Sequence, residues 1–393
     1  MKVAGIICEY NPFHNGHLYQ LEQTRKQATH IICVMSGNYV QRGAPAIIDK
    51  WTRAKAAVNC GADLVIEMPT PWACSAAENF ASCGVYLLAS LKTEVLSFGC
   101  ETENITALKK AAGAADSKLI GEIVKKEISH GLTYPAALRK AVECCFDEKT
   151  AAVFDEPNNT LATEYIRQSQ KQGVDFEYLP IKRMGADHGN ECLNHVNIAS
   201  AAALRKIEKI ELIKDYIPGK SVSMLGELEK NGLYPYRVEN AERALLAALR
   251  LMSADEMGYY ICDESGLAQR IYRVSRTAAS YEELIMKVKV KGITLAAIRR
   301  AVFSCLLKIP ASIQKKKPPY IKILAMNKKG AEIIKNSNCD LPIISRYSQV
   351  SALSDYGKEV YYLECASTDL YSLFSKKISD CSREQTSPIY VAD

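Results

Sequence analysis

The stretch Val3–Leu21, VAGIICEYNPFHNGHLYQL, decides the fold of this chain and points to its chemistry. The apolar run Val3–Cys8 predicts a buried strand; a turn that contains His14-Asn15-Gly16-His17 follows it and leads into a helical pattern. Gly16 lets the backbone approach a ligand because it has no Cβ, and the free N–H groups at the start of a helix attract an anion. His14 and His17 can then donate to charge that develops on a phosphate. The alternative is a helix start with two surface histidines.

Similar apolar runs recur through the first half of the chain and alternate with helical patterns. The runs are Ile31–Met35, Leu64–Glu67, Val95–Phe98 and Phe176–Ile181, and the helical stretches between them include Lys50–Cys60 and Ala76–Ser90. This alternation predicts an α/β fold with a doubly wound, Rossmann-like parallel sheet. Ligands bind such sheets at the carboxyl ends of the strands, where the histidine pair is expected.

The pattern becomes mainly helical near residue 198. The expected helices are Ala199–Ile213, Asn240–Leu251, Ser265–Ala278 and Leu295–Leu307. In the last of these, Thr294 is the expected N-cap, and Arg299 and Arg300 are expected to face away from a buried stripe of Leu295, Ile298, Val302 and Leu306. After the basic segment Lys315–Lys317, a small C-terminal α/β unit is expected, with strands at Tyr320–Ala325, Leu341–Ser345 and Glu359–Leu363. The expected boundaries are therefore 1–190, 191–310 and 311–393.

Composition places the chain among ordinary globular proteins. Of its 393 residues, 48% are hydrophobic and 24% are charged, and the net charge of +6 permits an anionic partner without requiring one. The 14 cysteines include no C-x-x-C pair, and neither a secretory signal nor an apolar stretch of membrane length is found. We therefore expect reduced thiols, a cytoplasmic location and no membrane partner.

Polar and basic residues are expected at other strand ends and helix starts. The loop Ser36–Gly43 offers Ser36, Gly37 and Arg42, whose guanidinium suits a carboxylate or a phosphate. Lys182 and Arg183 follow a strand, and Ser200 and Arg205 lie at a helix start, as a triphosphate site requires. Asn158 and Asn159 open a helix, where an amide either reads a nucleoside or caps the helix. For the loop Ser36–Gly43, the alternative is a solvated loop without a ligand. For the basic residues after the strand and at the helix start, the alternative is a set of surface cations.

Two other patterns are interpreted as having no ligand. Asp187, His188, Cys192 and His195 are close in sequence, but their spacing is not that of a known zinc finger, so a polar loop is expected and no metal site. Gly219-Lys220-Ser221 resembles the end of a phosphate-binding P-loop, but Lys214 stands where the motif requires glycine.

Taken together, the segments resemble the bacterial tRNA(Met) cytidine acetate ligase family, which is similar in fold to nucleotidyltransferases and class I aminoacyl-tRNA synthetases. The resemblance covers nearly the whole chain. It is carried by GIICEYNPFHNGH, MSGNYVQRGAPAIIDKW, GADLVIEMP, SFGCE, HGLTYP, PNNTLATEYI, IKRMGA, IASAAALR and ILAMNKKGAEII. It implies a nucleotidyltransferase-type, ATP-binding domain over 1–190 and a tRNA-binding helical region over 191–310.

The resemblance also implies a reaction in two steps. Acetate attacks the α-phosphate of ATP and gives acetyl-adenylate, and the 4-amino group of the wobble cytidine of elongator tRNA(Met) then takes the acetyl group to give N4-acetylcytidine. His14 and His17 would stabilise the α-phosphate, and Mg²⁺ bound with ATP would neutralise the β- and γ-phosphates. The implied ATP-binding residues are Ile7, Cys8, Glu9, Tyr10, Asn11, Pro12, Phe13, His14, Asn15, Gly16, His17, Leu18, Gly99, Asn159 and Arg183.

Cations in the second half of the chain are the expected tRNA contacts, with a solvated charged surface as the alternative. They are Lys287, Lys289, Lys291, Arg299, Arg300, Lys315, Lys316 and Lys317. No DNA partner is expected. The chain departs from the family pattern at Ala162, at Asp187–Asn190, at Ala202 and at Gly292. Two other functions remain: an adenylyltransferase for a small phosphorylated substrate, and a non-catalytic RNA-binding relative.

Overall fold

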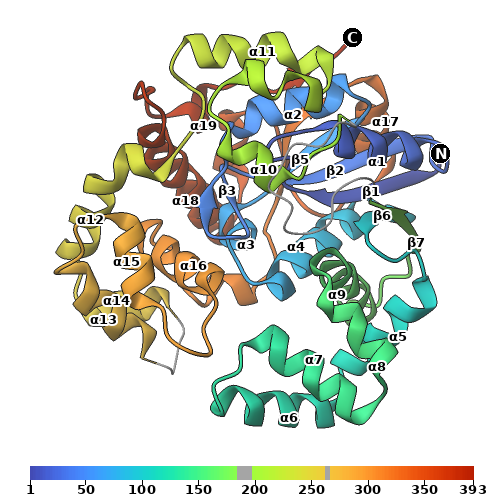
Figure 1. The fold of residues 1–393 in the computed structure, drawn as a ribbon. Coiled ribbons are helices and arrows are strands. Elements are labelled where there is room, and N and C mark those ends of the chain that lie inside the picture. Colours follow the sequence, from blue (N-terminus) through green and yellow to red (C-terminus); the bar gives the residue numbers. More distant parts are fainter. Residues whose placement is uncertain (184–196, 262–265) are drawn as a thin grey trace.

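One large sheet forms the centre of the molecule (Figure 1). The structure, a computed structural model, describes residues 1–183, 197–261 and 266–393. The strand order is β10-β8-β5-β2-β1-β6-β7, and β9 pairs with β8. The strands are β1 (Val3–Cys8), β2 (His30–Ser36), β5 (Leu64–Met68), β6 (Val95–Cys100), β7 (Glu177–Lys182), β8 (Ile321–Met326), β9 (Ile343–Ile344) and β10 (Tyr390–Val391).

The five strands from the first half of the chain, β5, β2, β1, β6 and β7, run parallel, so their carboxyl ends meet at one edge of the sheet. The chain moves outward from β1 to β5 on one side and from β6 to β7 on the other, which confirms the predicted doubly wound topology. A short hairpin of β3 (Tyr39–Val40) and β4 (Ala44–Pro45) follows β2.

Helices cover both faces of the sheet because both faces are apolar. Ile31, Cys33 and Met35 of β2 pack with α1 and α2, whereas Ile32 and Val34 on the other face share a core with α4 and α9. The helices before β7 are α1 (Asn15–Arg25), α2 (Lys50–Asn59), α3 (Thr70–Ala73), α4 (Ala77–Ser90), α5 (Ile105–Ala115), α6 (Lys118–Ser129), α7 (Tyr134–Cys145), α8 (Glu148–Ala151) and α9 (Pro157–Lys171).

Two groups of helices project from the sheet domain. α5 to α8 form one below the sheet in Figure 1, and α12 to α16 form the other beside it. The later helices are α10 (Ala201–Lys206), α11 (Gly219–Lys230), α12 (Glu242–Leu251), α13 (Ala254–Tyr260), α14 (Leu267–Ser275), α15 (Tyr281–Val288), α16 (Leu295–Leu306), α17 (Lys328–Asn336), α18 (Asp355–Tyr371) and α19 (Arg383–Thr386). Within the described part of the chain, no helix has the length and apolarity needed to span a membrane.

The two helical groups meet at a pair of glycine turns. A Cβ on Gly131 would lie 3.2 Å from the Lys291 side chain, and one on Gly292 would lie 3.6 Å from the backbone of Gly131. Gly292 has a φ of +89°, in the left-handed region that favours glycine. The departure from the family pattern at Gly292 therefore lies at a turn that needs a residue without a side chain.

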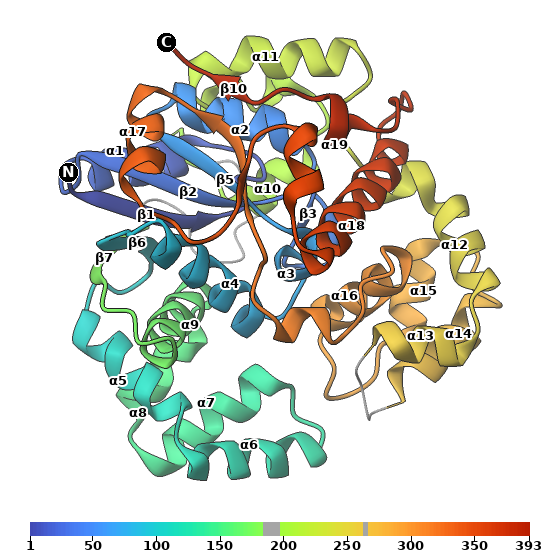
Figure 2. The same cartoon turned by 180° about the vertical axis from the view of Figure 1, so that it is seen from behind.

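Two predicted elements are wrong, and the C-terminal segment joins the main sheet. Glu359–Leu363, expected as a strand, lies inside α18, where Val360, Glu364 and Thr368 recur at helical spacing on the buried side. The helix expected over Ala199–Ile213 ends at Lys206 because Ile207 is extended. The segment expected to form a small C-terminal unit contributes β8, antiparallel to β5, and β10, parallel to β8, to the main sheet (Figure 2).

Candidate functional site

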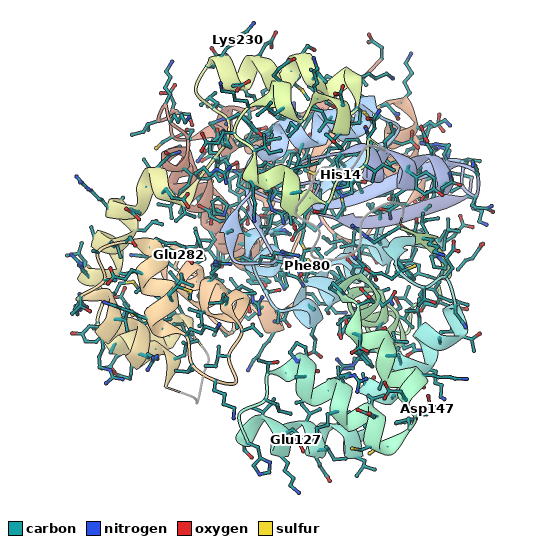
Figure 3. The ribbon with its side chains drawn as sticks, viewed as in Figure 1. His14, Phe80, Glu127, Asp147, Lys230 and Glu282 are labelled. Atoms are coloured by element: carbon teal, nitrogen blue, oxygen red, sulfur yellow. The ribbon has the colours of Figure 1, made fainter. Side chains whose placement is uncertain are left out.

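The histidine pair follows the carboxyl end of β1 and begins α1, and His14 is labelled in Figure 3. His14 is the N-cap, and its Nδ1 accepts from the N–H of Gly16 at 3.1 Å. The Nδ1 of His17 accepts from the N–H of His14 at 3.3 Å, and the two rings stack with centroids 3.7 Å apart. Because both Nδ1 atoms accept backbone hydrogens, each neutral ring carries its own hydrogen on Nε2.

Both rings are held neutral. Burial disfavours the charged form of His14, and Arg183 and Arg205 repel it further, so its pKa falls to about 3. The pKa of His17 is lowered well below its usual value, chiefly by burial and then by His14, Arg183 and Arg205. The pair therefore places two neutral rings beside two guanidinium groups, with the His17 ring also bonded to the Pro12 carbonyl. Nε2–H donors in this position stabilise negative charge without changing protonation.

Arg205 comes to this site from α10, and Arg183 from the end of β7. Arg205 donates to the carbonyl of Asn11 at 3.0 Å, and burial lowers the pKa of its guanidinium. Arg183 passes near Gly99, where a Cβ would lie 3.8 Å from its Cγ. The neighbouring Lys182 is exposed on β7. Ser200 uses its side chain to cap α10, accepting from the N–H of Ala203 at 3.1 Å. The structure thus brings Arg183 and Arg205 to the histidines.

Asn159 shapes the adjacent end of β6. Its Oδ1 accepts from the N–H groups of Glu101 and Thr102 at 2.9 and 3.0 Å. The carboxylate of Glu101 in turn accepts from the Asn159 N–H at 2.9 Å and from the Asn158 side chain at 2.5 Å. Both asparagines therefore hold the backbone beside Gly99, a role that the sequence did not reveal. Glu101 directly follows β6, at the strand end where the sequence places Gly99–Glu101, but its pairing with the two asparagines could not be predicted from the sequence.

Most side chains of the segment from Ile7 to Phe13 point into the protein. Ile7, Cys8, Tyr10 and Phe13 are buried. The Tyr10 hydroxyl lies 3.4 Å from the Cys33 sulfur, and burial raises the pKa of Tyr10. Pro12 follows a cis peptide bond, and Leu18 is half-buried in α1. These residues can offer a nucleotide mainly their backbone, whereas Asn15 is engaged through donation from its side chain to the carbonyls of Asn197 and Asp215 at 2.8 and 2.9 Å.

The loop Ser36–Gly43 is held at the same edge by a buried arginine on α2. The Arg53 guanidinium donates to the carbonyls of Ile48, Glu9 and Ser36 at 2.9, 2.5 and 3.1 Å, and also to that of Gly37. Burial lowers the pKa of Arg53. Arg53 thus joins the end of β1 to the end of β2, and it is buried in the protein.

Within the loop, the three candidate residues have different surroundings. Arg42 is exposed, and it is near enough to Arg205 to lower the pKa of that guanidinium. The Ser36 hydroxyl is buried and has no hydrogen-bond partner among the described residues. A Cβ on Gly37 would lie 2.5 Å from the Glu67 carboxylate, so no side chain fits there. Of the three, Arg42 is the one that can reach an incoming carboxylate or phosphate.

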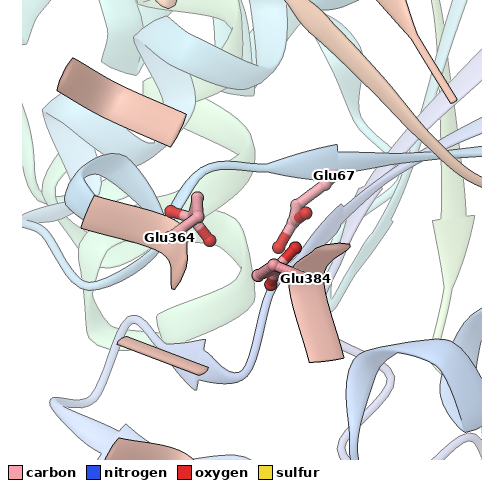
Figure 4. A group of neighbouring side chains, drawn as sticks. All are labelled: Glu67, Glu364 and Glu384. Carbon is pink, nitrogen blue, oxygen red and sulfur yellow. The ribbon is translucent and has the colours of Figure 1, made fainter. Parts of the chain in front are cut away.

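Behind the loop lies a buried charge cluster of Lys50, Lys322 and three glutamates. Figure 4 shows the glutamates, Glu67, Glu364 and Glu384. The three carboxylates approach as closely as metal ligands do. Two ammonium groups already lie among them: Lys50 bonds to Glu67 at 2.5 Å and to Glu384, and Lys322 bonds to Glu384. Burial and the Glu67 charge raise the pKa of Glu364 to about 8, whereas the lysines lower that of Glu384 to about 2. The cluster therefore anchors α18 and α19 behind the loop.

The cations proposed for RNA have several environments. Lys287, Lys289 and Lys291 are exposed on α15 and the turn after it, and Lys287 pairs with Glu283 at 2.5 Å. Lys315 to Lys317 are exposed, with Lys316 over the ring of Tyr356 and Lys317 over that of Tyr86. Arg299 lies 3.8 Å from Glu282.

Arg300 does not face solvent as expected. It donates to the carbonyl of Gln41 at 3.1 Å, and burial lowers its pKa. The residues Asp187, His188, Cys192 and His195 lie outside the described part of the chain. Two further departures from the family pattern lie on helices: Ala162 is buried in α9, and Ala202 lies in the first turn of α10.

Comparison with known proteins identifies the family of this chain. The family described as HIGH Nucleotidyl Transferase matches residues 1–386. A tRNA(Met) cytidine acetate ligase of Thermoanaerobacter sp. is 36% identical, with 96% of this chain and 97% of that protein aligned. The protein of the same name from Caldanaerobacter subterraneus subsp. tengcongensis is 34% identical over the same shares.

Solved structures show the same fold. The crystal structure of apo Thermotoga maritima TmcAL has a TM-score of 0.93 and 29% identity, covering 100% of this chain and 99% of that one. A second crystal structure of that protein, bound with alpha-thio ATP, has a TM-score of 0.90 with the same identity and coverage.

Proposed function

This chain belongs to the tRNA(Met) cytidine acetate ligase family, within the HIGH nucleotidyl transferases, and we propose that it activates acetate with ATP and acetylates the wobble cytidine of elongator tRNA(Met). It is an ATP-dependent ligase of the nucleotidyltransferase fold. The observation that supports the chemistry most directly is the pair of neutral Nε2–H donors beside Arg183 and Arg205. The acid preferred is acetate, the products are N4-acetylcytidine, AMP and pyrophosphate, and the reaction takes place in the cytoplasm.

In the first step, acetate attacks the α-phosphate and pyrophosphate leaves. His14 and His17 donate to the α-phosphate oxygens, whose negative charge increases in the transition state. Arg183 and Arg205 attract the polyphosphate to the start of α1, where the helix N–H groups also favour an anion. Gly99, Asn159 and the backbone from Ile7 to Phe13 hold the nucleoside end. Arg42, exposed beside Arg205, binds the acetate carboxylate.

The residues of the site fit Mg²⁺ as a partner of the phosphates. Magnesium keeps most of its water and binds through substrate phosphates and one or two carboxylates. The carboxylates nearest the strand ends are few, and those of Glu67 and Glu101 are engaged within the protein. Mg²⁺ would therefore bind with ATP and neutralise the β- and γ-phosphates, held mainly by the nucleotide.

The tRNA is bound by the exposed cations of the helical region. We assign Lys287, Lys289 and Lys291 to the RNA surface, with Arg299 beside them and Lys315 to Lys317 at the far end of α16. Arg300 is excluded because it is engaged with Gln41 inside the protein.

Exchange between ATP and labelled pyrophosphate tests this proposal. Exchange that depends on acetate and needs no tRNA is expected, followed by N4-acetylcytidine when elongator tRNA(Met) is added. An adenylyltransferase for a small phosphorylated substrate would show no dependence on acetate, and a non-catalytic relative would show no exchange.

A further inference from the structure

Transfer of the acetyl group to cytidine creates a surplus proton, and the histidines cannot accept it. In both rings Nδ1 accepts a backbone hydrogen and Nε2 carries its own, so neither has a free basic nitrogen. The amine loses this proton when it becomes an amide, so another group at the strand ends must take it. A carboxylate is the usual alternative base.

Among the described residues at the carboxyl ends of β1, β5 and β6 or at the N-cap of α2, four carboxylates lie near this edge, and three of them are already engaged. Glu101 accepts from Asn158 and from the Asn159 N–H. Asp49 accepts from the N–H and the hydroxyl of Thr52 at 3.0 and 2.9 Å. Glu67 is 1% exposed and bonds to Lys50. Glu9 is the fourth: its Oε1 accepts from the N–H of Gln41 at 2.9 Å, and its Oε2 has no partner among the described residues.

Glu9 lies beside the site and is open to it. It directly follows β1 and precedes the turn that carries His14, and its carboxylate is half-buried. Its charge acts on Arg205, the same guanidinium that lowers the pKa values of both histidines. A carboxylate in this position repels the phosphates of ATP, so it suits a group that donates N–H. The cytosine 4-amino group is such a donor, and Glu or Asp is its usual side-chain acceptor.

The helical region holds Glu9 in place. Arg300 of α16 donates to the Gln41 carbonyl at 3.1 Å, and the Gln41 N–H holds Oε1 of Glu9. Gly43, at a φ of +72°, packs on the backbone of Arg299 and Arg300, where a Cβ would collide with it. Glu9 therefore lies where the nucleotide site meets the region assigned to RNA, which is the side from which the base must enter.

We propose that Glu9 binds the 4-amino group of the wobble cytidine through Oε2 and removes its proton during acetyl transfer. The amine nitrogen forms a bond to the acetyl carbon, the bond from that carbon to the adenylate oxygen breaks, and AMP leaves with the electron pair. The surplus proton passes from nitrogen to the Glu9 carboxylate and then to water. Arg300 is a positioning residue, because it acts only through Gln41. This inference rests on the proposed function.

Glu9→Gln tests the proposal because the amide oxygen still accepts from Gln41 while the base is lost. Glu9 belongs to the ATP-binding segment through its backbone, which glutamine keeps together with the bond from Arg53 to its carbonyl. We therefore expect acetate-dependent pyrophosphate exchange within about threefold of wild type. Single-turnover acetyl transfer from preformed acetyl-adenylate to tRNA should fall by roughly 100- to 10,000-fold, the usual contribution of a general base. Glu22→Gln, which changes an exposed carboxylate on α1, is the matched control and should leave both steps unchanged.

Other outcomes overturn the proposal. Unchanged transfer by Glu9→Gln removes Glu9 as the base, and an equal loss of exchange, or a raised Mg²⁺ requirement for exchange, places it in the first step instead. Arg300→Met keeps the carboxylate, so it is the second variant: transfer should fall at least tenfold, with exchange and tRNA affinity retained. Exchange by the wild type that ignores acetate would refute the proposed function itself, which is a separate result.

Discussion

Replacing Arg53 by methionine should destabilise the sheet domain and weaken the first reaction step. The guanidinium is 1% exposed and donates to four carbonyls, two of them at the carboxyl ends of neighbouring strands. A hydrogen bond to a charged group contributes about 1.5–3 kcal/mol. Adding four such contributions overestimates the stability that Arg53 provides, because burying the cation has an unfavourable free energy of its own. The lowered pKa of Arg53 indicates this cost.

The expected loss follows from what Arg53→Met leaves behind. Removing one partner from a buried, hydrogen-bonded charge commonly costs about 3–5 kcal/mol, and we expect a loss of unfolding free energy in that range. Arg53→Lys keeps the charge but cannot reach all four carbonyls from one nitrogen, so about half that loss is expected. Because Arg53 holds the Glu9 and Ser36 carbonyls, both variants should also slow pyrophosphate exchange.

Urea unfolding followed by tryptophan fluorescence measures the unfolding free energy of the wild type and of both Arg53 variants. The chain has 2 tryptophans, Trp51 on α2 and Trp72 on α3, and both lie next to the sheet. Arg139→Lys is the control, since that arginine binds three carboxylates on the surface and should show little change. A loss below about 1 kcal/mol for Arg53→Met would refute the reasoning, because no buried carbonyl would then depend on this cation.

Four further predictions follow from the site and its supports. His14→Ala or His17→Ala should lower pyrophosphate exchange by roughly 100- to 1,000-fold while the fold is retained, with only the small loss of stability, about 1 kcal/mol, that follows from losing a cap bond of α1; near-normal exchange by both would contradict their role. Because burial lowers the pKa of His14 to about 3, exchange should show no change in rate near pH 6.5, and stability should fall as the pH drops from about 6.5 toward 3, where only the unfolded chain takes up the proton. With the pKa of Glu364 raised to about 8, stability should fall as the pH rises toward 8, and Glu364→Gln should abolish this dependence; Glu384→Gln, which leaves the buried ammonium groups of Lys50 and Lys322 with Glu67 as their remaining charged partner, should cost about 3–5 kcal/mol in urea unfolding. Neutralising Lys287, Lys289 and Lys291 should flatten the salt dependence of tRNA binding by about one unit per lost phosphate contact, and an unchanged slope would remove them from the RNA surface.

The first half of the fold could be predicted because its signals are local. Val3–Cys8 is β1 as predicted, Leu295–Leu306 is α16 with Thr294 as its N-cap, and the parallel order follows from the alternation of strands and helices. The prediction of a strand at Glu359–Leu363 was wrong because its four apolar or aromatic residues after the glutamate suit a strand as well as a buried helix. No local signal shows that β8 pairs with β5, since these strands are more than 250 residues apart in the chain and pair through tertiary structure alone.

In the candidate site, too, the features with a local sequence signal could be predicted, and those that depend on tertiary structure could not. His14 and His17 lie in a local motif, so their place at a helix start could be read from the sequence, whereas their hydrogen-bonding state depends on backbone geometry. Arg300 lies off the apolar stripe of α16 as predicted, but its contact with Gln41 could not be predicted, because helical spacing shows which residues leave the stripe and not which other segment meets them there.

The loop Ser36–Gly43 is held in place by helices that are distant from it in the sequence. Asn38 bonds to Thr368 at 3.1 Å, Tyr39 to the Ser367 carbonyl at 2.9 Å, and Lys50 to Glu384, so α18 and α19 hold the loop that faces the histidines. The same loop is held from the other side by Arg300 of α16. A reaction that must keep acetyl-adenylate from water until a tRNA base arrives needs a loop whose position depends on both regions. The position of this loop between α16 and α18 meets that requirement, because Arg300 on α16, in the region that we assign to RNA, is linked through Gln41 to Glu9.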